Sequence, residues 1–158
     1  MSTSAISDSG RVGAVGADPI LARVKEDPAY QAFWLLRIAF TVAPILFGAD
    51  KFANVLVNWE KYLAPWIRDV SPLSATHTMR VVGVIEIVAG VAVALKPRYA
   101  AYIVAAWLAG IIINLLSYSG YYDIALRDFG LMLGALTLAR LASEYDSPGL
   151  KPSLSASR

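Results

Sequence analysis

The sequence has no cysteine and a single histidine, His77, among its 158 residues. The missing cysteines exclude disulfides, thiol redox chemistry and iron–sulfur clusters ligated by this chain, and one histidine excludes a bis-histidine haem or a multi-histidine metal centre. Charge is also scarce, since 16% of the residues are charged, whereas a soluble domain carries about a quarter. We therefore expect no metal site and no cofactor held by this chain alone.

Positive charge is not concentrated anywhere along the chain. The net charge is +2 and the pI is near 8.9, but the Lys and Arg residues are spread out, whereas nucleic-acid binding needs a cluster. The alternation typical of β-strands is also missing, and no internal repeat is visible. What remains is hydrophobicity: 57% of the residues are hydrophobic and the mean hydropathy is +0.54. This balance favours lipid as the solvent.

Four apolar segments predict an all-α protein, an integral membrane four-helix transmembrane bundle. A helix of ~20 residues crosses the hydrocarbon core, and we expect spans at about 29–53, 75–95, 98–117 and 121–142, within one domain of residues 28–146. Charges in the second and fourth segments leave a soluble helical bundle as the alternative. The first and third segments argue against it, because they have no polar face for water.

The segments outside the spans are polar or mixed. We predict a disordered N-terminal tail over residues 1–17, a short interfacial helix over 18–27, and a disordered C-terminal tail over 147–158. Between the first two spans, Trp59, Tyr62 and Trp66 lie among polar residues, a mixture typical of the headgroup layer.

The distribution of basic residues predicts the orientation. With four spans, both termini and the turn at residues 96–98 lie on one side of the bilayer. Eight basic residues fall on that side and four on the other: Arg11, Arg23, Lys25, Lys96, Arg98, Arg140, Lys151 and Arg158 against Lys51, Lys61, Arg68 and Arg80. The positive-inside rule then places both termini in the cytoplasm.

Several ionisable side chains fall within the predicted spans, where each costs about 2.5–3.5 kcal/mol unless it is paired. Helix geometry allows five polar residues to converge in the outer half of the bundle. Arg37 lies deeper, where it reaches either Glu86 or the cytoplasmic interface, and Asp123 can pair with Arg127 one turn away. Structural ion pairs and a ligand or proton site both remain open for this group, which comprises Lys51, Glu86, Asn114, Arg127 and Asp128, with Arg37 and Asp50 completing the charge balance.

Glycines on the predicted helices favour close packing. Gly83 and Gly90 share one helix face with Glu86, and Gly110 shares a face with Asn114, while a further pair is spaced four residues apart. Small residues at such positions let helices approach closely in membranes. The predicted packing positions are Gly83, Gly90, Gly110, Gly130 and Gly134.

Three segments resemble the DoxX family of small four-helix membrane proteins, over roughly residues 35–141. Arg37 and the later segment 47–52 resemble the first-span arginine and the Gly-x-x-Lys ending of that family. The segment 83–90 is similar to its Gly-x-x-Glu-x-x-x-Gly signature, and Arg127-Asp128 to its fourth-span Arg-Asp. The resemblance implies a protein of a bacterial or archaeal cytoplasmic membrane. Named members of the family include the membrane subunit of thiosulfate:quinone oxidoreductase and components of redox-defence assemblies.

The leading hypothesis is a membrane subunit associated with a redox complex, in which the polar cluster binds a quinone head or an oxyanion. Arg127 and Lys51 would hold negative charge, Glu86 and Asp128 would accept protons, and partner proteins would supply electrons. The first alternative is a non-catalytic assembly or scaffold subunit, in which the same charges are structural and the loop 59–68 docks a partner. The second is a small permease built as a dimer. Expected partners are the lipid bilayer and other subunits of a complex or a second copy.

Overall fold

The computed structural model describes residues 27–146. The predicted tails at 1–17 and 147–158 lie outside the described residues. Residues 18–26 of the predicted interfacial helix lie outside them as well. Within the described part the protein is all-α, as predicted, and no β-strand is present there.

Four long helices make up the fold: α2 (Pro28–Ala53), α4 (Ala75–Leu95), α5 (Pro97–Leu116) and α6 (Tyr122–Tyr145). Between α2 and α4 lie a short 3-10 helix, η1 (Trp59–Tyr62), and a short α-helix, α3 (Pro65–Val70). Three of the long helices, α2, α4 and α5, are long and apolar enough to cross a membrane. The predicted all-helical fold is thus confirmed, and three of the four predicted spans have the length and hydropathy of a membrane-spanning helix.

Caps and prolines define the helix starts. The Asp27 carboxylate accepts hydrogen bonds from the backbone N–H groups of Ala29 and Tyr30, at 2.9 and 3.2 Å, ahead of a proline in the first turn. Such a residue satisfies N–H groups that have no partner within the helix. At its other end α2 stops at Asn54, whose φ of 52° lies in the left-handed region. Only Lys96 separates α4 from α5, which begins at Pro97.

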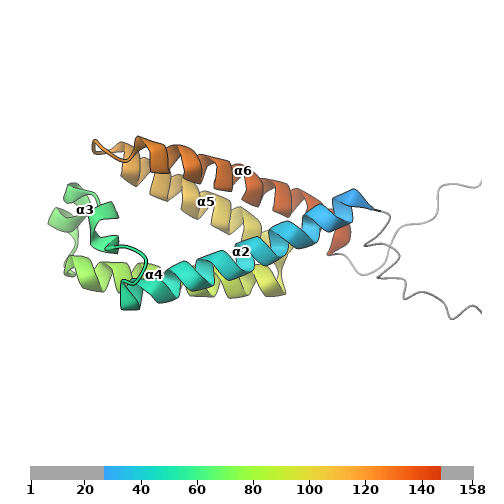
Figure 1. The fold of residues 1–158 in the computed structure, drawn as a ribbon, viewed down its shortest axis with the longest axis horizontal. Coiled ribbons are helices and arrows are strands. Elements are labelled where there is room, and N and C mark those ends of the chain that lie inside the picture. The colour runs from blue at the N-terminus through green and yellow to red at the C-terminus, as the bar shows by residue number, and fades with distance from the viewer. Residues whose placement is uncertain (1–26, 147–158) are drawn as a thin grey trace, which may run out of the picture.

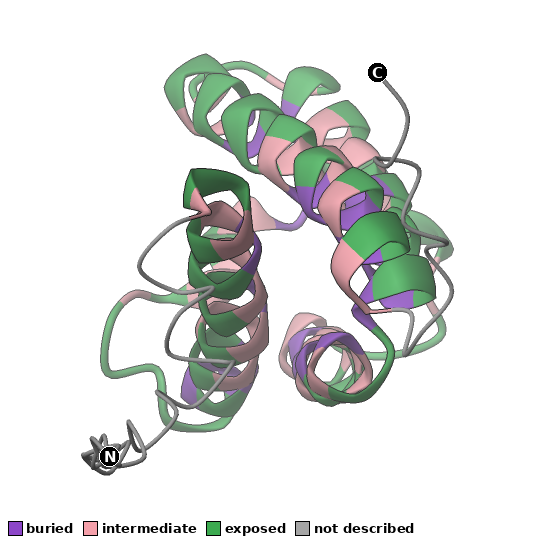
Figure 2. Cartoon of the chain, turned by 90° about the vertical axis from the view of Figure 1, so that its right-hand side faces the viewer, coloured by how far each residue is buried: buried purple, intermediate pink, exposed green. Residues whose placement is uncertain are grey.

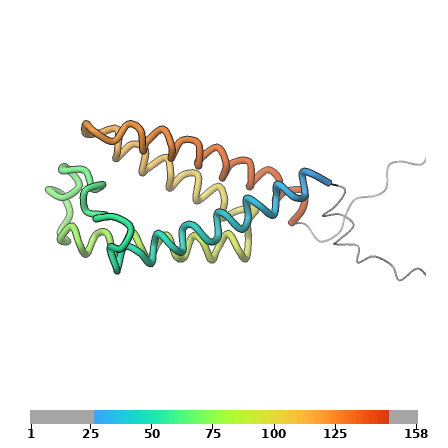
Figure 3. The backbone as a smooth tube through the Cα atoms, viewed as in Figure 1, coloured from blue at the N-terminus to red at the C-terminus, as the bar shows by residue number. Residues whose placement is uncertain are grey.

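The helices form two pairs, α2 with α4 and α5 with α6. The two pairs come together at the end that carries the Lys96 turn, and they separate toward the other end, where η1 and α3 lie (Figures 1 and 3). Buried positions lie on the sides of the helices that face one another, and exposed positions lie on the outside (Figure 2). The core consists mainly of small and aromatic residues: Phe33, Phe40, Val93, Ala100, Ala101, Val104, Ala105, Ala135, Leu138, Ala139 and Ala142.

The outward helix faces are apolar as well. Large hydrophobic side chains are exposed along every long helix, for example Leu35, Val88, Ile103 and Leu126. A helix in water needs a polar stripe on its outer face, whereas a helix in lipid does not. The surface therefore has the character of a membrane protein.

Three glycines in the α2–α4 pair allow the two backbones to touch. A Cβ atom added to Gly48 would lie 2.5 Å from the carbonyl oxygen of Gly83, and one added to Gly90 would lie 2.7 Å from that of Thr41. Contacts this close leave no room for a side chain. Gly83 and Gly90 thus pack as predicted, and Gly48 is a further packing position.

Of the other three glycines predicted to pack, only Gly134 lies against a neighbouring helix. A Cβ atom on Gly134 would lie 3.2 Å from the ring of Phe40, so this glycine lets α2 approach α6. The prediction is wrong for Gly110 and Gly130, since nothing lies within 4 Å of a Cβ atom added at either one. Both are on outward faces, which the sequence does not distinguish on helices that are apolar all round.

Candidate functional site

Lys51 and Glu86 form a buried ion pair between α2 and α4. Their Nζ and Oε2 atoms are 2.5 Å apart, and 4% and 13% of the two side chains are exposed. Each residue follows a packing glycine, Gly48 or Gly83, by three positions, so the close glycine contact brings the two helices within reach of the lysine side chain. A pair this well buried is screened little by solvent.

The indole of Trp59 covers the other side of the lysine. The Lys51 ammonium lies 3.7 Å from the centroid of the Trp59 ring, a cation–π contact. The Asp50 carboxylate accepts a hydrogen bond from Trp59 Nε1 at 2.7 Å and others from the backbone N–H groups of Val55 and Leu56, at 2.9 and 3.1 Å. Asp50 thus shapes the turn after α2 and holds the indole against Lys51. The sequence around Trp59 predicts a position in the headgroup layer, and nothing in its spacing indicates this contact with Lys51.

Asn114 does not join the charged cluster, contrary to the prediction. Its amide donates a hydrogen bond to the carbonyl of Tyr62 at 2.7 Å and accepts one from the N–H of Ala64 at 3.0 Å. The segment it holds comes from between η1 and α3, and Leu63 and Ala64 are buried there, with 5% and 0% exposed. We refer to residues 59–70 as the cap, because they close the end of the bundle at which the helix pairs separate (Figure 1).

Further hydrogen bonds fix the cap to its neighbours. Glu60 accepts one from the hydroxyl of Thr76 on α4 at 2.6 Å, and the Trp66 indole donates one to Ser117 at 2.9 Å. The Tyr118 hydroxyl donates to the carbonyl of Lys61 at 3.3 Å. Burial and the neighbouring Tyr121 raise the pKa of Tyr118, so its phenol stays protonated and remains a donor.

The neighbouring residues Arg127 and Asp128 on α6 differ in how far they are exposed. Asp128 is buried, with 7% of the residue exposed. Arg127 leaves 68% of its side chain exposed, and its Nε lies 3.4 Å from Asp128 Oδ1. The expected convergence of Arg127 with Lys51 and Glu86 is therefore not observed. Its recorded ion pair is with Asp128, and none is found with Asp123 among the described residues.

Arg37 lies at the opposite end from the cap. Its guanidinium donates a hydrogen bond to the carbonyl of Ala94 at 2.6 Å and lies 3.7 Å from the Asp146 carboxylate. The ring of Trp34 stacks against it, with 5.0 Å between the guanidinium carbon and the ring centroid. Arg37 does not reach Glu86, because the α2–α4 register places it beside the last turn of α4. It satisfies a carbonyl that has no partner within that helix.

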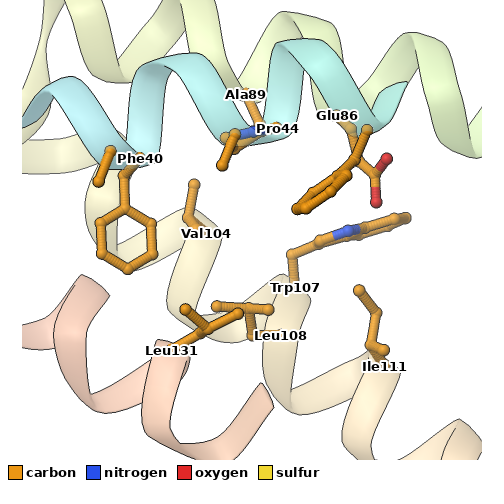
Figure 4. Close-up of a pocket in the computed structure, with 12 residues that line it drawn as sticks. Phe40, Pro44, Glu86, Ala89, Val104, Trp107, Leu108, Ile111 and Leu131 are labelled. Carbon is orange, nitrogen blue, oxygen red and sulfur yellow. The ribbon is translucent and has the colours of Figure 1, made fainter. Parts of the chain in front are cut away.

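A cavity of about 150 Å³ lies between the two helix pairs, with walls from all four long helices. Its lining is apolar except for the Glu86 carboxylate, which projects toward the indole of Trp107 (Figure 4). The Trp107 Nε1 atom is buried and has no hydrogen-bond partner in the described structure. The main apolar walls are Phe40, Phe47, Val104, Leu108 and Leu131.

The size and lining of the cavity limit what it can hold. An apolar cavity of ~150 Å³ accommodates a benzene-sized ring. Glu86 and Trp107 add one carboxylate and one N–H donor to that space, so an aromatic or quinoid ring with polar substituents matches it chemically. No group of three or more His, Cys, Asp or Glu residues able to hold a metal ion occurs among residues 27–146.

No protein-family model, curated protein or solved structure matches this chain. The similarity to the DoxX family rests on the three sequence segments alone, and we infer the function from the cavity and the groups around it.

Proposed function

We propose that this chain is a membrane subunit that receives the head of a quinone in the cavity between its helix pairs and acts together with redox partner proteins. The observation that carries this proposal is the unpartnered N–H of Trp107 facing a ring-sized apolar cavity that also contains Glu86. An unpaired buried donor costs about 1–3 kcal/mol. A quinone carbonyl would accept this hydrogen bond, and Glu86 would exchange a proton with the reduced ring.

The composition supports the involvement of partner proteins. The chain has no cysteine and the described residues hold no metal-binding cluster, so the electrons that reduce a quinone would come from another subunit. The resemblance to the DoxX family is consistent with this role, since one of its named members is the membrane subunit of thiosulfate:quinone oxidoreductase.

The proposal includes four membrane crossings with both termini in the cytoplasm of a bacterial cell. The 24 residues of α6 reach ~36 Å, enough to span the hydrocarbon core. This helix packs along α5, and its charged residues lie toward its two ends: Asp123, Arg127 and Asp128 at one, Arg140 and Glu144 at the other. If α5 crosses the bilayer, α6 returns beside it, and the basic residues then favour a cytoplasmic Lys96 turn.

Removing the Trp107 donor tests the proposal. Trp107→Phe deletes the N–H and keeps an aromatic ring, and no intramolecular hydrogen bond is lost. Binding of a decyl-substituted benzoquinone to purified protein in mild detergent should weaken by about tenfold, the effect of one hydrogen bond worth ~1.4 kcal/mol. Trp34→Phe at the far end of α2 is the matched control and should bind like the wild type. Undetectable binding to the wild type, or equal loss in both variants, would contradict the proposal.

A non-catalytic scaffold subunit is the second candidate, and the cap favours it. The Asp50 and Asn114 side chains are both used to hold this segment, as expected of a rigid docking element. A scaffold would assemble with its partners equally well in Trp107→Phe and would not bind the quinone. Measuring complex assembly and quinone binding on the same preparations separates the two functions.

A further inference from the structure

The geometry points to the seam between α2 and α6 as the entrance through which a ligand dissolved in the bilayer reaches the cavity. We define this entrance by Phe47 on α2 and Leu131 on α6, both of which line the cavity. The ligand's identity as a quinone rests on the proposed function, but the route does not.

The contacts within each helix pair close two possible routes. Along α2 and α4, Gly48 and Gly83 bring the backbones into direct contact. Along α5 and α6, Ala101, Ala135 and Ala139 are completely buried. Both interfaces are closely packed at these residues, so neither offers an open route there.

The cap closes the route from water at its end of the bundle. Leu63 and Ala64 fill the space there, and the Asn114 side chain holds this segment with two hydrogen bonds. Trp59 covers Lys51 on the same side. A ligand in the aqueous phase therefore meets a packed surface above the ion pair.

The exposed part of the cavity lining lies on α2 and α6. Phe47 and Leu131 are 43% and 42% exposed, whereas the lining residues from α4 and α5, such as Glu86 and Trp107, are at most partly exposed. Toward the Lys96 turn the seam is closed, because the Phe40 ring packs on Gly134. The opening thus occupies the half of the seam nearer the cap, at a depth where acyl chains surround the helices.

This route sets the chemical class of the ligand. A molecule with its ring in the cavity must leave any substituent in the seam, so a long apolar chain is accommodated there. Arg127 lies one turn from Leu131 on the same face of α6, and its guanidinium is paired with the Asp128 carboxylate. The rim therefore offers no unpaired charge to a charged head. The site fits an amphiphile with a single uncharged ring and a long tail.

Photolabelling from the bilayer tests the entrance without any assumption about quinone. A phenyl diazirine dissolved in the vesicles carries a single aromatic ring, which a cavity of this volume can hold, and it should label Trp107 and Leu108 on α5. Leu131→Trp should reduce this labelling about tenfold, which corresponds to ~1.4 kcal/mol of steric exclusion. Val88→Trp places the same bulk on the lipid-facing side of α4 and should leave labelling unchanged. Unchanged labelling in Leu131→Trp would overturn the entrance.

A second variant and a competitor complete the test. Phe47→Ala removes bulk from the opposite side of the entrance and should increase labelling, so the inference does not depend on Leu131→Trp folding. Added decyl-benzoquinone should compete with the diazirine. If the variants change labelling as expected but the quinone does not compete, the entrance stands and the proposed function fails. If the quinone competes while labelling is insensitive to both variants, the proposed function stands and the entrance fails.

Discussion

The ammonium of Lys51 lies between the Glu86 carboxylate, at 2.5 Å, and the centroid of the Trp59 ring, at 3.7 Å. The carboxylate compensates the charge, and the ring excludes water from it. Because Glu86 also lines the cavity, the same ion pair belongs to the helix interface and to the candidate binding site. Under the proposed function, stability and quinone binding are therefore linked through Glu86.

Removing one partner of this ion pair should destabilise the protein. Lys51→Met leaves the Glu86 carboxylate buried without its cation, and we expect a loss of about 3–5 kcal/mol in the free energy of unfolding. The double variant Lys51→Met/Glu86→Leu removes both charges and should recover most of that loss. Unfolding followed by circular dichroism in detergent micelles measures the cycle. Additive losses in the double variant would show that the two residues do not act as a pair.

Glycine substitutions should separate packing positions from exposed ones. Gly48→Ala forces a methyl group against the Gly83 carbonyl, and overpacking of this kind costs about 1–3 kcal/mol. Gly110→Ala is the matched control, since its methyl group would meet nothing within 4 Å and alanine favours helix by up to ~1 kcal/mol. Thermal unfolding of the two variants should therefore shift in opposite directions. Equal shifts would contradict the α2–α4 contact.

These positions also show what the sequence can predict. Gly83, Glu86 and Gly90 share a helix face by their spacing alone, and the structure places this face against α2. Gly110 has similar local surroundings but faces outward, because an apolar helix gives no sign of which side meets its neighbour. The roles of Asn114 and Trp59 were missed for another reason. Both depend on the path of the non-helical segment between α2 and α4, which periodicity does not describe.

The Asn114 side chain should hold the cap in place. Asn114→Leu keeps a similar volume but leaves the buried N–H of Ala64 and the carbonyl of Tyr62 without their partners, at a cost of about 1–3 kcal/mol for each group. Hydrogen–deuterium exchange in a peptide covering residues 59–66 should accelerate, while exchange in the centre of α5 stays slow. Ser119→Ala, in the exposed turn before α6, serves as the control. Unchanged exchange in the cap peptide would mean that other contacts hold this segment.

Arg37 should stabilise the far end of the bundle independently of Glu86. Arg37→Leu removes the hydrogen bond to the Ala94 carbonyl, and hydrogen bonds from charged donors contribute about 1.5–3 kcal/mol. Asp146→Asn should have little effect, because its partner atom is 3.7 Å away and both side chains are partly exposed. The losses of Arg37→Leu and Glu86→Gln should add in the double variant. A strong coupling between them would argue for the direct contact that the sequence suggested.

The orientation of α6 can be tested without background labelling, because the native chain has no cysteine. Single cysteines at Arg98, Ser119 and Ser143 occupy exposed positions at the two ends of the long helices. In intact cells, a membrane-impermeant maleimide should label Ser119→Cys only, because four crossings place the other two positions in the cytoplasm. Arg98→Cys and Ser143→Cys should react after the membrane is permeabilised. Labelling of Ser143→Cys together with Ser119→Cys in intact cells would mean that α6 does not cross the bilayer, and the fourth span would have to be abandoned.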